Sequence, residues 1–423
     1  MKVLVIGGGG REHAIAWKVS MSPKVDKVYC APGNAGISEC AECVDIPVND
    51  HKALADFALS KGIDLTIVGP DDPLAEGVVD VFEENGLRIF GPRKNAAIIE
   101  SSKVFSKNLM KKYNIPTAAF ETFDSAGDAI AYLKSCKFPI VLKADGLAYG
   151  KGVLICSNYD EAVKGVKSIM EEKKFGAAGN RLVIEEYITG PEVSVLAFCD
   201  GTHIIPMTSA QDHKRIYDDD KGPNTGGMGT LSPSPFYTAQ IDDYCKKHIY
   251  QPVIDAMKAE GREFVGILFV GLMLTQDGPR VLEFNARFGD PEAQVVLPRL
   301  KNDLVEVCEA CIDGRLNEIK LSFEDNAAVC VILASEGYPE KFEKGYEIQG
   351  LESLAGKKDY IVFHAATKRE NGRILTNGGR VLGVTAIGSD LKNARRKAYE
   401  GAEKIYFKNK YMRKDIGKVI EYL

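Results

Sequence analysis

The segment that most restricts the fold of this chain is RVLEFNARFGDPEAQ, residues 280–294. Within its short apolar run Glu283 and Asn285 stand two positions apart, so both side chains face one side of a strand, and Arg287 follows at the same spacing. Alternating charges are also ordinary on a half-buried strand with a solvated edge. The glycine and proline of RFGDPE favour a functional site instead, because they predict a sharp turn into a helix beginning near Glu292. Oxygen donors on one face suit a hard cation, so we interpret the segment as a magnesium and phosphate corner.

Composition limits the classes of protein to which the chain can belong. At 423 residues it is long enough for about three domains, and its 45% hydrophobic and 27% charged residues exclude a disordered chain. With 54 Lys and Arg against 59 Asp and Glu, the net charge of −5 offers no polyanion-binding face, so we expect no nucleic-acid partner. Met1 leads directly into the strand-like KVLVIG without a signal-peptide pattern, and no apolar run reaches the length of a membrane span. We therefore expect a cytoplasmic protein with no membrane partner.

The ten cysteines include two CxxC pairs, Cys40 with Cys43 and Cys308 with Cys311. A four-thiolate zinc site is one interpretation, but such sites usually have both pairs on tight turns. The second pair lies in DLVEVCEACI, where apolar residues and cysteines share one helical face, a pattern typical of core packing. We expect reduced, structural thiols.

The N-terminal pattern predicts a parallel βαβ domain over residues 1–100. The apolar run 2–7 ends at Gly7–Gly10 and a helical pattern follows, and this order of strand, glycine turn and helix suits a phosphate group. Dinucleotide binding is the alternative, but Asp45 lies too far along the chain to be the usual ribose acid. We expect a phosphorylated small molecule at this turn, with Gly9 at a positive φ. Further strands of the domain are predicted at 64–70 and 87–91.

The next part of the chain predicts a long helix and then a lid. The helix is expected over 94–114, and from residue 117 to residue 190 the order strand, helix, strand, glycine loop, strand, helix, strand predicts a separate α+β lid. Lys143 ends a strand before the glycine loop, which is not a Walker loop because its glycine spacing differs and a strand follows. A glycine hairpin that carries lysines can fold over phosphates as a mobile flap, although a flexible surface hairpin has the same composition. The flap residues are Gly146, Gly150, Lys151 and Gly152.

Two later segments carry polar residues in patterns that suit ligand contacts. The strand in RLVIEEYITGPEVSV leads to Glu185 and Glu186, and can offer backbone groups to a purine ring and a carboxylate to ribose hydroxyls; plain surface charges are the alternative. The loop 208–230 is polar and rich in glycine, and such a loop in a compact protein is usually functional or disordered. Asp212–Arg215 on one side of it and Asn224–Gly229 on the other form a mixed-charge set suited to a zwitterion.

The remaining residues, 326–423, predict a small C-terminal α+β domain. Strands are expected near 327–334 and 360–366 and a helix at 390–405. Asn-Gly-Gly between two apolar runs predicts a β-hairpin over 374–388. No candidate catalytic group is evident in this domain.

With its motifs in this order the chain resembles the ATP-grasp carboxylate-amine ligases, and more narrowly the glycinamide ribonucleotide synthetase family. The resemblance covers nearly the whole chain, and RFGDPE followed at one remove by Gln294 is specific for this family among its relatives. It implies an α/β and α+β multidomain fold, in which an ATP-grasp core over 101–325, with the lid at 117–190, lies between the N- and C-terminal domains. The other motifs that carry it are GGREHA (9–14), APGNAG (31–36), KADGLA-x-GKGV (143–153), SAQDHKR with GPNTGGMG (209–229) and TNGGRVL (376–382).

The resemblance implies ligation of glycine to 5-phosphoribosylamine, with ATP and Mg²⁺ or Mn²⁺ as cofactors. Glycine's carboxylate attacks the γ-phosphate to give glycyl phosphate, and the amine then displaces phosphate, so positioning and charge neutralisation replace a protein nucleophile. A purine-pathway carboxylase is the alternative within the superfamily, but such enzymes lack RFGDPE. A nicotinamide-dependent oxidoreductase would explain only residues 1–14, and intact metal ligands and lysines disfavour a non-catalytic nucleotide-binding module. We expect a monomer, with a dimer as the alternative.

Carried over residue by residue, the resemblance also implies roles in the site. Glu283 and Asn285 are the metal ligands. The catalytic residues are Lys143, Arg287, which stabilises charge on the transferring phosphoryl group, and Asp212, which holds an ammonium group. ATP is bound by Lys103, Lys143, Gly146, Gly150, Lys151, Gly152, Glu185, Glu186, Ile188 and Glu192. The other substrates are bound by Gly9, Gly10, Asn34, Asp212, Lys214, Asn224, Gly226, Arg287 and Asp290.

Overall fold

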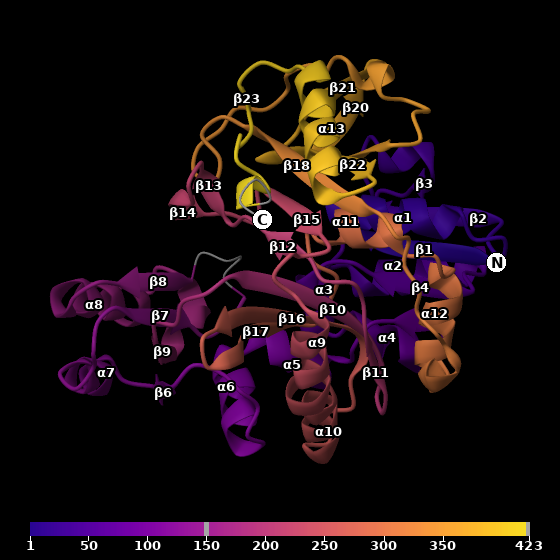
Figure 1. Ribbon diagram of the computed structural model, residues 1–423. Coiled ribbons are helices and arrows are strands. Elements are labelled where there is room, and N and C mark those ends of the chain that lie inside the picture. The colour runs from indigo at the N-terminus through magenta and orange to yellow at the C-terminus, as the bar shows by residue number, and fades with distance from the viewer. Residues whose placement is uncertain (148–151, 420–423) are drawn as a thin grey trace.

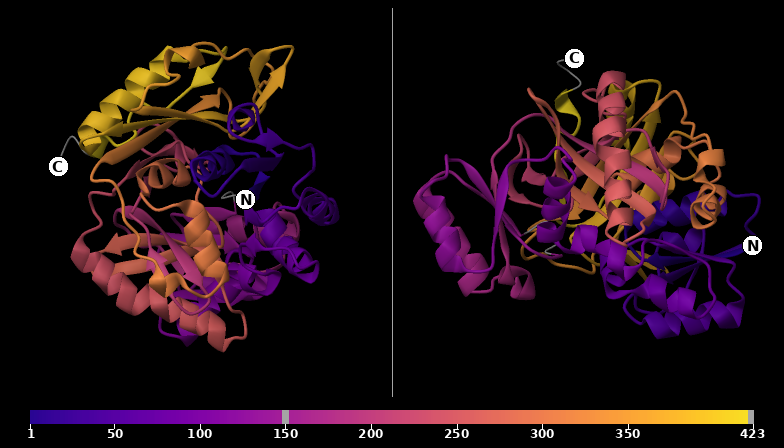
Figure 2. Two further views of the ribbon diagram at one scale, coloured as in Figure 1. Left: turned by 90° about the vertical axis from the view of Figure 1, so that its right-hand side faces the viewer. Right: turned by 90° about the horizontal axis from the view of Figure 1, so that it is seen from below.

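The computed structural model describes residues 1–147 and 152–419, so Gly150 and Lys151 of the predicted flap lie outside the described residues. Figures 1 and 2 show an N-terminal part, a lid that projects to one side, a central sheet, and a C-terminal part above that sheet. This arrangement confirms the predicted multidomain fold class. In the described part of the chain, no helix combines the length and the apolarity needed to cross a membrane.

The N-terminal part is a five-stranded parallel sheet in the order β3-β2-β1-β4-β5. Its central strand buries side chains on both faces, as expected for a parallel sheet covered by helices on each side. The predicted strands at 2–7, 64–70 and 87–91 are confirmed. The elements are β1 Lys2–Gly7, α1 Gly10–Ser20, β2 Lys27–Pro32, β3 Glu42–Cys43, α2 His51–Lys61, β4 Leu65–Val68, α3 Asp71–Glu76, α4 Val78–Glu84 and β5 Ile89–Phe90.

The single helix predicted over 94–114 is wrong, because the chain forms two helices, α5 Lys94–Ser101 and α6 Lys103–Lys112. Ser102 separates them in an extended conformation, with φ −134° and ψ 108°. Its hydroxyl accepts a hydrogen bond from the backbone N–H of Phe105 at 3.1 Å, which caps α6. The same hydroxyl donates to Asp145 of the lid at 3.0 Å. The break therefore makes Lys103 the first residue of a new helix, next to the lid.

The lid has the predicted order of elements and a core of its own. Its sheet runs β6-β9-β7-β8 and is antiparallel, and α7 and α8 pack against it around a separate cluster of buried side chains. In Figure 1 this unit projects to the left, away from the N-terminal sheet. The elements are β6 Phe120–Phe123, α7 Ala126–Leu133, β7 Ile140–Ala144, β8 Val153–Cys156, α8 Tyr159–Val166 and β9 Leu182–Glu186.

The central sheet, in the order β11-β10-β16-β17, is antiparallel and is covered on both faces. Along β16, Leu268 and Val270 pack in one buried cluster with α10, whereas Ile267 and Phe269 pack in another with α12, since successive strand side chains face opposite sides. Both clusters extend into the N-terminal sheet, so the two parts share their core. The elements are β10 Glu192–Asp200, β11 Ile204–Pro206, α9 Ala239–Cys245, α10 Gln251–Ala259, β16 Val265–Thr275, β17 Gly278–Asn285, α11 Ala293–Val296 and α12 Leu304–Ile312.

The predicted turn and helix after β17 are present, since α11 begins directly after Glu292. Cys308 and Cys311 lie fully buried on α12, which confirms that this CxxC pair packs in the core. Helix α12 is capped at its N-terminus by Asp303, whose side chain accepts a hydrogen bond from the N–H of Val305 at 2.9 Å.

The C-terminal sheet also contains strands from the middle of the chain. Its path is β12-β15-β18-β22-β19, with β23 on β18, and β12 and β15 come from the polar 208–230 segment. The long helix α13 packs on β22 and β18. The domain boundary at residue 326 stays a prediction, and the sheet itself crosses it. The elements are β12 Gln211–Asp212, β15 Gly229–Ser232, β18 Ala327–Ser335, β19 Tyr360–His364, β22 Arg380–Gly388, α13 Leu391–Lys404 and β23 Lys410–Tyr411.

The hairpin predicted over 374–388 is wrong. β21 (Arg373–Thr376) pairs with β20 (Thr367–Glu370), whereas β22 pairs with β18 and β19. The Asn-Gly-Gly segment therefore links two different sheets. A side chain at Gly379 would meet the ring of Tyr338 at 2.1 Å, so glycine is needed there for close packing rather than for a tight turn.

Candidate active site

A cavity of about 1380 Å³ opens between the lid, the end of the central sheet and the C-terminal sheet. Most of the residues that the sequence singled out line it, although they come from segments far apart in the chain. The predicted site residues in its wall are Lys103, Lys143, Gly146, Gly152, Glu185, Glu186, Ile188, Glu192, Asp212, Lys214, Asn224, Gly226, Glu283, Asn285, Arg287 and Asp290. Gly9, Gly10 and Asn34, which are predicted to contact substrate, are not among the described residues that line it.

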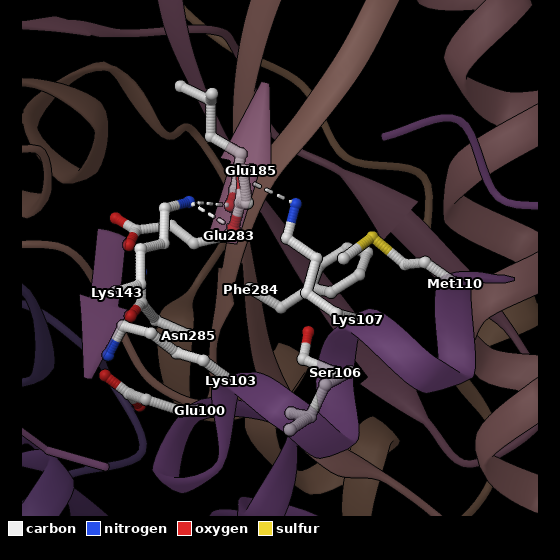
Figure 3. A pocket seen from close by; sticks show the side chains of 12 residues that line it. Glu100, Lys103, Ser106, Lys107, Met110, Lys143, Glu185, Glu283, Phe284 and Asn285 are labelled. Carbon is white, nitrogen blue, oxygen red and sulfur yellow. Dashed lines mark hydrogen bonds and ion pairs between the residues drawn. The ribbon is translucent and has the colours of Figure 1, made fainter. Parts of the chain in front are cut away.

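Glu283 and Asn285 both line the cavity from β17, as their two-residue spacing predicts. They also line a smaller neighbouring pocket beside α6, which is the pocket drawn in Figure 3. The ammonium group of Lys214 lies 3.5 Å from Glu283, and Lys143 and Lys103 are also close enough to act on its charge. Burial opposes ionisation of Glu283, but these cations, Lys214 above all, outweigh it and lower the pKa of the carboxyl to about 2. Glu283 is therefore a carboxylate at neutral pH.

Arg287 is held by a residue that the sequence did not single out. Glu100, at the end of α5, is buried and lies 2.9 Å from an Nη atom of Arg287, and it also accepts a hydrogen bond from the N–H of Ala286 at 2.7 Å. A buried carboxylate with two such partners orients the guanidinium toward the cavity edge. The strand that carries the metal-ligand candidates is thus tied to the helix before the lid.

Glu185 does not face the outer edge of the cavity, where the sequence interpretation placed a ribose contact. Its side chain is only 2% exposed and lies between two lysines, 3.0 Å from Lys143 and 2.9 Å from Lys107 (Figure 3). A contact between this carboxylate and ribose stays a prediction, but both of its oxygens already face ammonium groups. Glu186, the next residue, is exposed and accepts a hydrogen bond from the N–H of Ala119 at 2.8 Å.

Lys103 connects the start of α6 to the lid loop. Its ammonium group donates to the carbonyl of Gly146 at 2.9 Å. Gly146 has φ +144°, and an added Cβ would lie 2.9 Å from that of Ala178, so both conformation and space require glycine. Burial lowers the pKa of Lys103, although Glu283 opposes the shift.

The 208–230 segment and the end of the RFGDPE turn bring together two acidic residues, the half-buried Asp212 and the buried Glu292. Burial, and then the charge of Glu292, raise the pKa of Asp212 well above its ordinary value. Glu292 is 3% exposed and accepts a hydrogen bond from Ser194 at 3.0 Å. Lys214 lies beside the pair, and Glu283 raises its pKa against the effect of burial. Burial raises the pKa of Glu292 as well, so an incoming cation would stabilise the ionised forms of these two acids.

The N-terminal turn meets the cavity at Asp290. An added Cβ at Gly9 would lie 2.8 Å from a Glu12 carboxylate oxygen and 3.6 Å from one of Asp290, and one at Gly10 would lie 2.6 Å from Gln294. The positive φ expected at Gly9 is wrong: Gly9 is extended, with φ −93°, and Gly7 has the positive value of +127°. A side chain at Gly9 would have to displace the end of the Glu12 side chain, whereas its distance from Asp290 is an ordinary contact.

Asn34 joins the N-terminal and C-terminal parts. Its amide nitrogen donates to the carbonyls of Gly8 at 2.9 Å and His364 at 2.8 Å, and its oxygen accepts from the N–H groups of Gly36 and Ile37. The amide nitrogen and the amide oxygen of Asn34 therefore both form hydrogen bonds within the protein. A substrate contact by Asn34 stays a prediction and would come from its backbone.

Sequence reasoning missed four residues of the site: Glu100, Lys107, Glu292 and Arg380. Arg380, from β22, lies 3.2 Å from Asp290, donates to the carbonyl of Gly226 at 2.7 Å and lines the cavity, so residues 326–423 also contribute to its wall. The expectation that they hold no catalytic group stays a prediction. Arg380 lies in TNGGRVL and Glu292 in RFGDPE, two motifs of the family resemblance, and this is the signal that could have found them. Nothing in a single sequence marked Glu100 or Lys107 apart from ordinary helix charges.

Comparison with known proteins gives the family of the chain. Models of the N domain, the ATP-grasp (A) domain and the C domain of phosphoribosylglycinamide synthetase match residues 1–100, 101–293 and 328–419. A phosphoribosylamine-glycine ligase of Caldanaerobacter subterraneus subsp. tengcongensis is 51% identical over 98% of this chain and 99% of its own length.

The chain belongs to the phosphoribosylglycinamide synthetase family.

Other relatives are consistent with this membership. A trifunctional purine biosynthetic protein of Gallus gallus is 50% identical over 98% of the chain and 42% of its own length. The crystal structure of phosphoribosylamine-glycine ligase from Thermotoga maritima superposes with a TM-score of 0.86 at 33% identity, covering 98% of this chain and 100% of that one. A biotin carboxylase domain from Hydrogenobacter thermophilus shares the fold, with a TM-score of 0.75 at 18% identity over 97% of this chain and 91% of that one.

The residues of this phosphoribosylglycinamide synthetase homologue suit a metal that is bound together with phosphates. In the described residues there is no cluster of three or more His, Cys, Asp or Glu side chains that could hold a metal ion. One carboxylate and one amide oxygen on the same strand, Glu283 and Asn285, match a cation that takes its other ligands from substrate phosphates and water.

Proposed function

We propose that this chain is a phosphoribosylamine-glycine ligase of de novo purine biosynthesis, which joins glycine to 5-phosphoribosylamine with ATP to give glycinamide ribonucleotide, ADP and phosphate. The observation that carries the proposal is the full-length match to a relative of that name at 51% identity. The enzyme is an ATP-grasp ligase, and a cavity lined by lysines, a carboxylate and an amide supports that chemistry.

In the first step an oxygen of glycine's carboxylate attacks the γ-phosphorus of ATP, and the bond from that phosphorus to ADP breaks. Lys103 and Lys143 bind the phosphates, and Arg287, oriented by Glu100, stabilises the transferring phosphoryl group. Glu283 and Asn285 would hold Mg²⁺, or Mn²⁺, next to the phosphates of ATP. This ion would neutralise phosphate charge and fix the geometry of the phosphates for in-line transfer.

In the second step the amine nitrogen of 5-phosphoribosylamine attacks the carbonyl carbon of glycyl phosphate. The carbon-oxygen bond to the phosphate breaks, an amide forms, and the nitrogen loses a proton. Exclusion of water matters here, because glycyl phosphate hydrolyses readily, and the lid over residues 117–190 covers the cavity for this purpose.

Each substrate has a proposed place in the cavity. Asp212, next to Glu292, holds the ammonium group of glycine, and a cation there relieves the burial of two acids. The ribose phosphate lies at the turn of Gly9 and Gly10, which opens α1. The adenosine lies along Glu186, Ile188 and Glu192, and the other proposed substrate contacts are Asn34, Lys214, Asn224, Gly226 and Asp290. We further propose a cytoplasmic monomer.

Release of ADP tests the proposed reaction. With MgATP present, ADP should form only when both glycine and freshly made 5-phosphoribosylamine are added, and glycinamide ribonucleotide should accumulate in equal amount. Omission of either substrate is the control. ADP release that depends on bicarbonate instead of glycine would contradict the proposal and indicate an ATP-grasp carboxylase.

A further inference from the structure

Lys107 places a second buried ammonium group next to the phosphate-binding region. It lies on α6 one turn after Lys103, and its side chain is only 3% exposed. Its ammonium group is 2.9 Å from one carboxylate oxygen of Glu185 and donates to Thr117 at 2.7 Å. Lys143 lies 3.0 Å from the other oxygen of the same carboxylate. Figure 3 shows the two lysines on opposite sides of Glu185.

This network joins the lid to the central sheet. At one end the hydroxyl of Thr117 donates to the carbonyl of Val281 at 2.6 Å. At the other end the ammonium group of Lys143 donates to the carbonyl of Leu282 at 3.1 Å. Both ends therefore lie on neighbouring residues of β17, directly before the metal-ligand candidate Glu283. The network therefore connects the start of the lid, at Thr117, to strand β17 of the central sheet.

The charges in the network do not balance. One carboxylate lies between two ammonium groups, so the three side chains carry a net charge of +1 when all are ionised. A buried carboxylate that loses one of two cationic partners interacts more strongly with the other. With Lys107 in place, Glu185 is shared, and Lys143 keeps positive charge available for an anion in the cavity. Without the ammonium group of Lys107, Lys143 would be the sole counterion of Glu185, and its charge would be less available to an anion in the cavity.

We propose that Lys107 is a positioning residue, which acts through Glu185 to keep the ammonium group of Lys143 placed and available for the phosphates of ATP. Lys107 lies on the far side of Glu185 from Lys143, and two of its three N–H donors are used by Glu185 and Thr117. It therefore acts through the carboxylate and not by touching ATP. This role rests on the proposed function, since it presumes that the cavity binds ATP.

The first test compares Lys107→Met with Lys111→Met. Lys111 is one turn further along the same helix and lies over the same ring, that of Phe120, at 5.5 Å against 5.6 Å for Lys107. Its side chain is 61% exposed, and it pairs with Glu121 at the surface at 3.4 Å. Binding of a magnesium complex of a non-hydrolysable ATP analogue should weaken about tenfold in Lys107→Met, because a buried charge contact of the site is lost, and stay unchanged in Lys111→Met. Equal affinity of the two variants would overturn the proposal.

The second test separates positioning from simple packing. In the double variant Lys107→Met with Glu185→Gln, the amide no longer competes for the charge of Lys143, so most of the lost affinity for the analogue should return. If Lys107 only filled space, the double variant would bind no better than the single one, and that result would overturn the proposal. In steady state, the KM for ATP should rise in Lys107→Met while the KM for glycine stays the same.

Folding and the proposed function are checked separately. Melting curves of each variant report stability, and if Lys107→Met does not fold, Lys107→Gln, which keeps a donor without the charge, should show the same tenfold loss of analogue binding. A Lys107→Gln variant with wild-type affinity would overturn the proposal. Failure of the wild-type protein to bind the analogue would instead contradict the proposed function on which the inference rests.

Discussion

Replacement of Glu283 by glutamine should lower kcat by about two orders of magnitude or more, comparable to the loss of one group that stabilises transition-state charge. The carboxylate is ionised, with a pKa lowered to about 2, and it lies among cationic side chains that would bind the phosphates. Glutamine keeps the shape and one oxygen donor but removes the negative charge that holds the divalent cation. The dependence of the rate on Mg²⁺ concentration should therefore shift to higher concentration, which steady-state assays over a Mg²⁺ series would measure.

A matched control for this variant is Glu121→Gln. Glu121 lies on the exposed face of strand β6 and has a surface partner, Lys111, at 3.4 Å. Surface pairs of this kind contribute little, so turnover should stay at the wild-type level. A Glu283→Gln variant with near-normal turnover and a normal melting curve would remove the assignment of Glu283 as a metal ligand.

Replacement of Gly9 by valine should reduce kcat/KM for 5-phosphoribosylamine by about two orders of magnitude and leave ATP affinity almost unchanged. The N–H of Gly9 donates to Glu12 at 2.6 Å, and an added Cβ would lie only 2.8 Å from the same carboxylate. A side chain there would deform the turn that opens α1, where the ribose phosphate is proposed to bind. The lysines proposed for ATP lie on α6 and β7, away from this turn.

Gly127→Val is a suitable control, because Gly127 lies on α7 in the lid and its added Cβ would meet only the hydroxyl of Ser125, at 3.6 Å. The two variants should be compared for 5-phosphoribosylamine kinetics, ATP-analogue binding and melting temperature. Loss of ATP affinity as large as the loss of acceptor use, or an unfolded Gly9→Val protein, would contradict the division between an acceptor site and an ATP site.

Local patterns allowed much of the fold to be predicted from the sequence. β1 is an apolar run that ends in glycine, and β17 alternates between half-exposed and buried residues except at Leu282, where the strand register shifts, so both strands could be recognised from their side-chain patterns. The order of elements in the lid followed from the same rules. Glu283 and Asn285 could be placed together because a strand has a fixed two-residue period.

The errors arose where tertiary contacts decided the structure. Ser102 breaks the predicted long helix because its hydroxyl both caps α6 and binds Asp145, which lies 43 residues away. Glu185 turns inward because two lysines from other segments neutralise it, which no local pattern reveals. Arg380 reaches the cavity only because β22 joins a sheet that also holds strands from the 208–230 segment. Pairings across such distances in sequence leave no periodic signal.

One isotope measurement tests the central claim, ATP-driven ligation through glycyl phosphate, most directly. The enzyme is incubated with MgATP, 5-phosphoribosylamine and glycine whose two carboxylate oxygens are ¹⁸O, and the products are analysed by mass spectrometry. One labelled oxygen should appear in inorganic phosphate and the other in the amide carbonyl of glycinamide ribonucleotide, since the attacking oxygen leaves with the phosphoryl group. Labelled AMP with release of pyrophosphate, or phosphate without label, would contradict the proposed route.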